Sequence, residues 1–269
     1  MKPLLLILLL CIPTFSSAES HLTGAFTQGG LLQGRVAAGT RVFYSDRPVK
    51  VSAGGDFILG FGRDAELNHS LTLIKPSGDI RLEELQIRQR DYRVQRIDGI
   101  RKNLLQPNAE ELQRISQEAA LVAKVRQLNS DLPNFSEDFI WPLTGPITGV
   151  YGSQRIFNGE PRRPHFGVDI AAPTGTPLVA PAGGRVTLAH QGMFFSGVTL
   201  IIDHGHGLSS SFLHLQKVLV KEGESLQQGQ TIATVGASGR VTGPHLDWRI
   251  NWFEQRLDPA LLVPEMPKK

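Results

Sequence analysis

The sequence predicts a mainly β protein. We expect a small N-terminal β domain, one connecting amphipathic helix, and an antiparallel β-sheet or barrel in the C-terminal half. Two observations predict this class. Short segments rich in Val, Ile, Leu and Phe alternate with Gly and Pro turns across residues 20–87 and again from residue 139 onward. The clearest helical repeat of apolar residues lies between these two regions. With 41% hydrophobic residues, the chain can bury a core.

Residues 1–18 are predicted to be a secretory signal peptide. Lys2 gives a positive start, Leu4 to Ile12 is an apolar run too short for a stable span, and Ala18 offers a small residue at the cleavage point. A retained membrane anchor is the alternative. Cleavage would leave a periplasmic or secreted chain with no transmembrane segment. The one cysteine falls within this peptide, so the mature chain would hold neither a cysteine nucleophile nor a thiolate ligand.

Residues 19–87 form the predicted small β domain. No residue in it indicates catalysis, and His21 and His69 are interpreted as isolated surface residues. This domain is a spacer, a binding module or a cover for an active site, and the sequence does not choose among these.

Residues 88–138 are predicted to be a basic connection followed by a helix. Residues 88–102 carry six basic and two acidic side chains. We interpret them as a solvated connection, with a specific anionic contact as the alternative. Asn108 and Glu111 have the spacing of a capping box, and Asn129 and Pro133 are expected to end the helix. The expected apolar stripe consists of Leu112, Ile115, Ala119, Val122 and Val125.

The whole chain carries a formal net charge of +3. This excess is too small to indicate a nucleic-acid partner. It suits an anionic surface such as a cell wall.

Residues 139–269 form the predicted C-terminal β domain, and they contain a recurring polar pattern. Because side chains alternate along a strand, His165 and Asp169 should share one face, and His245 and Asp247 should share another. In a third segment, Phe212 and His214 should lie on one face. His204 and His206, by contrast, are interpreted as turn residues.

Taken singly, each of these side chains has an ordinary structural explanation. A lone histidine beside apolar residues is usually structural, and an aspartate near a turn usually caps backbone or contacts solvent. Five such residues in three strands instead indicate a divalent metal together with a histidine that can move protons. The pattern therefore favours a hydrolase that uses a metal-activated water.

These segments resemble the M23 family of zinc metallopeptidases, the lysostaphin/LytM-like peptidoglycan endopeptidases. The family pattern is H-x-x-x-D, then a histidine in a strand, then H-x-H, and the similarity covers about residues 141–262. The resemblance implies a lysostaphin-like β fold and a Zn²⁺ cofactor held by His165, Asp169 and Asp247. It implies that His214 and His245 handle protons, and that the substrate is peptidoglycan, cut within its cross-link peptides.

Asp247 departs from the family pattern, in which this position is histidine. A carboxylate is an acceptable zinc ligand, but a ligand charge of −2 makes the ion a weaker activator of water. We expect a slower enzyme, a higher pH optimum or a different metal preference. The alternative is a catalytically weak or inactive regulator, an activator of cell-wall amidases that binds in the same cleft. A third hypothesis is autoinhibition, in which the helix or the N-terminal domain covers the cleft.

Overall fold

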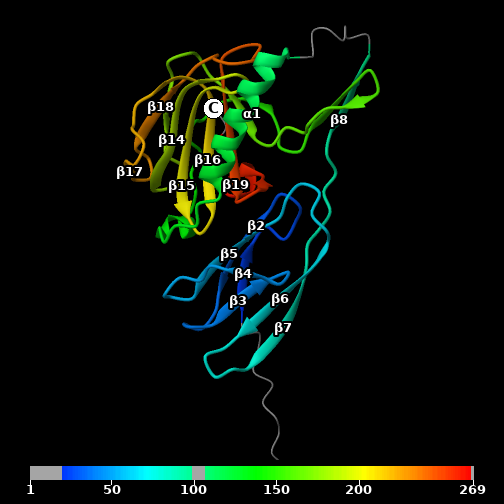
Figure 1. Cartoon of the computed structure of the whole chain (residues 1–269), viewed down its shortest axis with the longest axis vertical. Coiled ribbons are helices and arrows are strands. Elements are labelled where there is room, and N and C mark those ends of the chain that lie inside the picture. Colours follow the sequence, from blue (N-terminus) through cyan, green and yellow to red (C-terminus); the bar gives the residue numbers. More distant parts are fainter. Residues whose placement is uncertain (1–19, 99–106, 268–269) are drawn as a thin grey trace, which may run out of the picture.

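The computed structural model describes residues 20–98 and 107–267, which form two β lobes stacked end to end (Figure 1). The N-terminal lobe is blue to cyan, and the larger C-terminal lobe is green to red. The mainly β class is therefore confirmed, with one long helix in the described part of the chain. The predicted signal peptide, residues 1–18, lies outside the described residues. Across the described ranges, no helix is long and apolar enough to cross a membrane.

The N-terminal lobe contains two small antiparallel sheets, in the orders β1-β2-β5 and β4-β3-β6-β7. Their strands are β1 (His21–Gly24), β2 (Leu31–Arg35), β3 (Arg41–Tyr44), β4 (Arg47–Val49), β5 (Asp56–Gly60), β6 (Asn68–Ile74) and β7 (Ile80–Gln86). Alternation explains the inward face of β6, where Leu71 and Leu73 are fully buried between more exposed neighbours.

The C-terminal lobe is built on a ten-stranded sheet with the central order β17-β14-β15-β16-β19-β12-β9. Neighbouring strands in it are antiparallel, β13 pairs with β18, and β20 pairs with β19. The strands are β9 (Ile147–Gly149), β12 (Val168–Ala171), β13 (Pro177–Val179), β14 (Gly184–Met193), β15 (Gly197–Gly205), β16 (Leu208–Val218), β17 (Ser225–Leu226), β18 (Thr231–Val235), β19 (His245–Trp252) and β20 (Gln255–Leu257). Two short 3₁₀ helices, Pro133–Ser136 and Pro259–Leu261, lie outside this sheet.

A fourth sheet joins the basic connection to the C-terminal half. β8 (Val94–Ile97) runs parallel to β10 (Gln154–Phe157), which pairs with β11 (Glu160–Pro161). Arg90, just before β8, donates to Asp258 at 2.8 Å. Most of the described side chains in this connection are exposed, as expected of a solvated segment, whereas Arg90 makes the specific anionic contact of the alternative, in a partly buried ion pair with Asp258.

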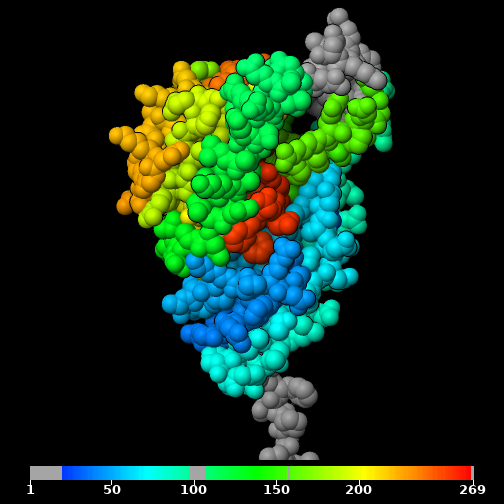
Figure 2. Space-filling model, viewed as in Figure 1, coloured from blue at the N-terminus to red at the C-terminus, as the bar shows by residue number. Residues whose placement is uncertain are grey.

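The helix α1 (Ala109–Arg126) begins with the predicted capping box, in which Asn108 and Glu111 satisfy each other's backbone N–H groups. It lies across the front of the C-terminal lobe, where its green surface is exposed (Figure 2). The predicted apolar stripe is only partly used. Val122 and Val125 pack against a small core on β14 and β15, whereas Leu112 is 54% exposed. The first turns of α1 therefore carry apolar surface into solvent.

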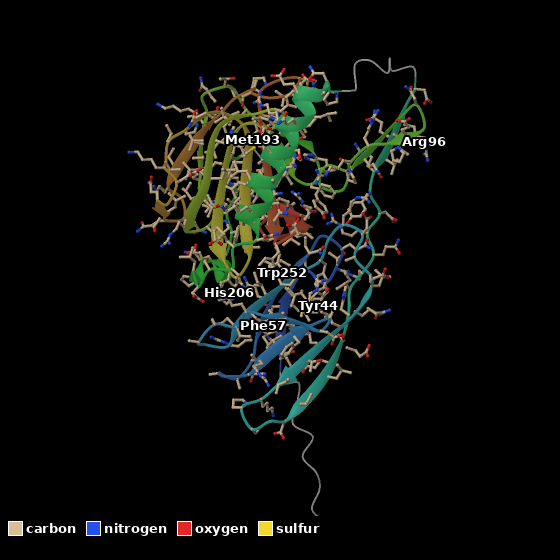
Figure 3. All side chains as sticks on the ribbon, viewed as in Figure 1. Tyr44, Phe57, Arg96, Met193, His206 and Trp252 are labelled. Carbon is tan, nitrogen blue, oxygen red and sulfur yellow. The ribbon has the colours of Figure 1, made fainter. Side chains whose placement is uncertain are left out.

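The two lobes share one continuous hydrophobic core. Trp252, at the end of β19, lies at the seam with its ring 6.1 Å from that of Tyr44 in the N-terminal lobe (Figure 3). Across the same seam, Lys50 pairs with Asp131 at 2.6 Å. His69 is not the isolated surface residue that was predicted, because its Nδ1 lies 2.8 Å from the Tyr44 hydroxyl and its ring packs beside Phe61.

Candidate metal centre

The central pair of the site is Asp169 on β12 and Asp247 on β19, which are directly opposite each other in the antiparallel ladder. Directly opposed residues project from the same face of a sheet, with their Cβ atoms about 5 Å apart. The alternation predicted for β19 is observed, since Leu246, Trp248 and Ile250 are fully buried in the core on the other face. The sheet therefore presents two carboxylates side by side above an apolar underside.

His165 completes a potential donor set. It precedes β12 and is fixed by two backbone hydrogen bonds at 2.8 Å, one donated by its N–H to Ser153 and one accepted by its carbonyl from Gly152. One donor atom from each of His165, Asp169 and Asp247 lies within 4.8 Å of the other two. Imidazole nitrogen and carboxylate oxygen are both suitable zinc ligands, so this set has the chemistry and the compactness of a metal site.

Two glycines leave room for the carboxylates. A Cβ at Gly149, on β9, would lie 2.1 Å from Oδ2 of Asp169. A Cβ at Gly167 would lie 2.4 Å from Oδ1 of Asp247. Real Cβ atoms do not approach an oxygen this closely, so any larger residue would push the carboxylates out of their present positions. Glycine at both points creates a cradle around the donor atoms.

Two of the donor atoms are buried and lack a hydrogen-bond partner. His165 Nε2 and Asp169 Oδ1 lie 3.2 Å apart, yet both are buried and neither has a hydrogen-bond partner. Buried polar atoms in folded proteins are almost always satisfied, and leaving one unsatisfied costs about 1–3 kcal/mol. A cation between these two atoms would satisfy both. The residues present therefore fit a divalent metal such as Zn²⁺.

Comparison with known proteins identifies the domain. The sequence profile described as "Peptidase family M23" matches residues 163–259. Residues 163–259 are a peptidase family M23 domain. The matched range contains all five residues singled out from the sequence, and the resemblance to this family is confirmed.

Known relatives extend the similarity beyond the M23 domain. Peptidoglycan DD-endopeptidase ShyC of Vibrio cholerae is 39% identical over 115 residues, which are 43% of this chain and 23% of the relative. Peptidoglycan DD-endopeptidase ShyA of the same organism is 28% identical over 201 residues, 75% of this chain and 42% of the relative. The chain thus matches less than half the length of either relative.

A solved structure matches nearly the whole chain. The putative peptidase M23 from Pseudomonas aeruginosa is 28% identical, with a TM-score of 0.69 covering 88% of this chain and 94% of that one. The structural similarity to this putative peptidase M23 therefore extends over both lobes.

The two other histidines of the predicted site, His214 and His245, flank the donor set. His214 Nε2 lies 4.0 Å from Oδ2 of Asp247, and His245 Nε2 lies 3.9 Å from Oδ1 of Asp169. Each Nδ1 is within hydrogen-bond distance of a backbone carbonyl, that of Ser238 for His214 and that of Gly243 for His245. A carbonyl only accepts, so Nδ1 donates in both rings. In the neutral rings the Nε2 lone pairs therefore face the site.

Burial keeps one of these rings uncharged. His214 is only 8% exposed, and this burial lowers the pKa of its imidazole below the ordinary value. The neighbouring His245, with its ring centroid 5.0 Å away, further disfavours a second positive charge. Neutral His214 is thus the form that can accept a proton near pH 7.

The backbone at His214 differs from the prediction. Regular alternation would place Phe212 and His214 on one face, but His214 has a φ of +62°. Phe212 and Leu215 both lie in the core, whereas residues three apart would face opposite sides of a regular strand. The alternation of side chains is therefore interrupted between them. Left-handed backbone is uncommon for a residue with a side chain. Here it turns the imidazole from the core toward the donor set.

Arg249 is a site residue that the sequence reasoning missed. It donates from Nε to Oδ1 of Asp247 at 2.9 Å and from Nη2 to Oδ2 at 2.5 Å. Burial alone would raise the pKa of Asp247, but the Arg249 guanidinium outweighs this effect and holds it below its usual range. A carboxylate has about four lone-pair positions, so Asp247 retains capacity for one more ligand. The signal was available in the spacing, because Arg249 follows Asp247 by two residues on the same strand.

The turn histidines also differ from expectation. His206 does lie in a turn with positive φ, but it is 4% exposed and its ring stacks on Phe135 at 3.8 Å. His204 is fully buried in β15, within hydrogen-bond distance of the Gly183 carbonyl and the Ser210 hydroxyl. Neither histidine is part of the donor set that His165 completes.

Proposed function

We propose that this chain is a zinc metalloendopeptidase of the cell envelope, periplasmic or secreted, that hydrolyses amide bonds in peptidoglycan cross-link peptides. The observation that carries the proposal is the pair of buried, unsatisfied donor atoms on His165 and Asp169, beside Asp247 and below two histidines. The names of the V. cholerae relatives support peptidoglycan as the substrate.

The residues have distinct roles in this proposal. His165, Asp169 and Asp247 would hold the ion. Bound zinc supplies a Lewis acid that polarises an amide carbonyl and makes water more acidic. His214 Nε2 accepts the proton of the attacking water, because its lone pair faces the site and burial keeps it neutral. His214 Nε2, now carrying that proton, can donate a hydrogen bond to the oxyanion that forms, while the Nε2 lone pair of His245 can accept a hydrogen bond from the attacking water and orient it.

Arg249 modifies the expected effect of Asp247. Two carboxylate ligands would bring the ligand charge to −2, but the guanidinium at hydrogen-bond distance returns the local sum to −1. The metal would therefore keep more of its positive charge than the ligands alone suggest.

The direct test uses the purified mature chain. We expect about one zinc per chain and chelator-sensitive release of peptide fragments from peptidoglycan. His165→Ala should lower metal affinity by about 100-fold or more, because even outer-sphere changes cost 10–100-fold. His21→Ala, at an exposed position in the N-terminal lobe, is the control and should keep both properties. Hydrolysis by metal-free His165→Ala protein would contradict the proposal.

A second candidate is a protein that binds in this cleft without cutting, such as a regulator with a cell-wall amidase partner. The observation that favours it is the engagement of both Asp247 oxygens by Arg249. Asp247→His separates the two candidates. If the wild type binds no zinc and the variant does, the regulatory function is supported. If the wild type already binds zinc and cleaves, it is rejected.

A further inference from the structure

Four arginines from four separate segments line one cleft beside the metal centre. They are Arg126 at the end of α1, Arg163 two residues before His165, Arg249 on β19 and Arg256 on β20. The cleft has a volume of about 400 Å³ and lies between α1 and the polar face of the sheet. In Figure 2 the red C-terminal segment meets the green helix at this side of the lobe. We call these residues the arginine cluster.

Arg126 is the buried member of the cluster. It is 7% exposed, and its Nη2 donates to the Ser211 hydroxyl at 3.2 Å. Its Nε is buried without a hydrogen-bond partner. Burial lowers the pKa of Arg126 well below its ordinary value, and the neighbouring Arg256 and Arg249 lower it further. A charge in this position costs free energy unless an anion compensates it.

Two further members are close together. The guanidinium carbons of Arg163 and Arg256 lie 5.6 and 5.8 Å from the centroid of the Phe166 ring. Burial, together with repulsion from Arg163 and Arg249, lowers the pKa of Arg256 to about 10. The positive charges of Arg163 and Arg249 thus disfavour the charged form of Arg256.

The carboxylates in the same cleft do not balance this charge. Glu118 is already committed, since it accepts from Arg114 at 2.8 Å and from the Phe194 N–H at 2.8 Å. Glu254 is exposed to solvent. Asp247, which does not line the cleft, is engaged by Arg249. Within the described residues, Glu254 is therefore the one acidic side chain of the cleft that is left to balance Arg126, Arg163 and Arg256.

The cleft adjoins the metal centre, because two arginines line both this cleft and the one that holds His165 and Asp169 of the donor set. Arg163 and Arg249 also line a second cleft, of about 780 Å³, whose walls include His165 and Asp169. An extended molecule with its reacting bond at the metal centre would therefore reach the arginine cluster with a neighbouring group.

We propose that the arginine cluster binds a carboxylate of the peptide that occupies the metal centre, and so selects acidic peptides. The planar guanidinium matches a carboxylate in bidentate geometry, and such charge-assisted bonds are about twice as strong as neutral ones. The inference rests on the proposed function for the peptide nature of the occupant. It does not require that the peptide be cut.

The test compares two peptides that differ in one group. The probes are acetyl-Ala-Glu-Ala-amide and acetyl-Ala-Gln-Ala-amide, titrated into the full mature chain by NMR and checked for integrity by mass spectrometry. We expect the glutamate peptide to bind about tenfold more tightly. Arg163→Gln, at an exposed position, and Arg126→Gln should each bring this ratio toward one. Arg185→Gln, on exposed β14 surface outside both clefts, should leave the ratio unchanged.

Each outcome decides the matter. Equal binding of the two peptides by the wild type, or an unchanged ratio in Arg163→Gln, overturns the proposal. Inorganic phosphate that binds in an Arg163-dependent way without any preference between the peptides would make this a free oxyanion site, and would also overturn it. Lack of zinc or of cleavage would refute the proposed function yet leave the peptide preference intact.

Discussion

The two faces of β19 contain different residues and serve different ends. One face carries Leu246, Trp248 and Ile250, all fully buried in the core. The other carries His245, Asp247 and Arg249, which face the metal centre and the arginine cluster. A strand alternates with a period of two, so eight residues provide both an apolar foundation and a chemical surface. Folding depends mainly on the first face and chemistry on the second.

The largest effect is expected from a substitution on the apolar face of β19. Trp248→Ala should lower the free energy of unfolding by about 4 kcal/mol, because it removes a fully buried indole that also contacts Trp141 edge-to-face. Urea denaturation of the metal-free protein measures this change. Leu82→Ala, at a position 64% exposed on β7, should cost far less. Similar losses in the two variants would show that β19 is not central to the core.

A smaller effect separates two functions within the polar face. Arg249→Gln removes a positive charge from beside the metal centre, so zinc affinity should rise about tenfold at constant pH. The same change should weaken binding of the glutamate peptide. Competition with a chelator measures the first effect, and NMR titration measures the second. If the zinc affinity and the peptide affinity both rose or both fell, the metal centre and the arginine cluster would not be separate sites.

The smallest expected effect is a change in the pH dependence of stability, caused by a histidine that is not on β19. Burial lowers the pKa of His204 in the folded protein, so the unfolded chain binds its proton more tightly. Its contribution to stability is therefore complete above about pH 6.5 and declines as the pH falls toward the lower folded pKa. The slope is at most about 1.4 kcal/mol per pH unit. His204→Gln should reduce the slope of unfolding free energy between pH 7 and 5, whereas His21→Gln should not.

Local patterns were sufficient to predict much of this molecule. Alternation in β19 and the capping box of Asn108 and Glu111 depend on neighbours in the sequence, and both are present. The family pattern also places Asp169 and Asp247 in one site, and the strand register sets them opposite each other. The assignment of individual roles to these residues stays a prediction.

Other features depend on tertiary packing. The left-handed backbone at His214 follows from where β16 meets β19 and β18, and no residue type signals it. The burial of Arg126 requires that α1 pack on the sheet, which the helix sequence alone does not specify. The domain boundaries at residues 87 and 138 likewise stay predictions, as does the hypothesis that the helix or the N-terminal domain inhibits the site.

The shared seam at Trp252 and Tyr44 has a consequence for how the lobes can be separated. Because one apolar core runs through both, heat should dismantle them in a single event. A fragment beginning near Glu137 would lack the N-terminal lobe and would expose Trp252 to solvent. Faster cleavage by such a fragment would then have two possible causes. Substrate would reach the metal centre more easily, and the packing of the apolar face of β19 would also have changed.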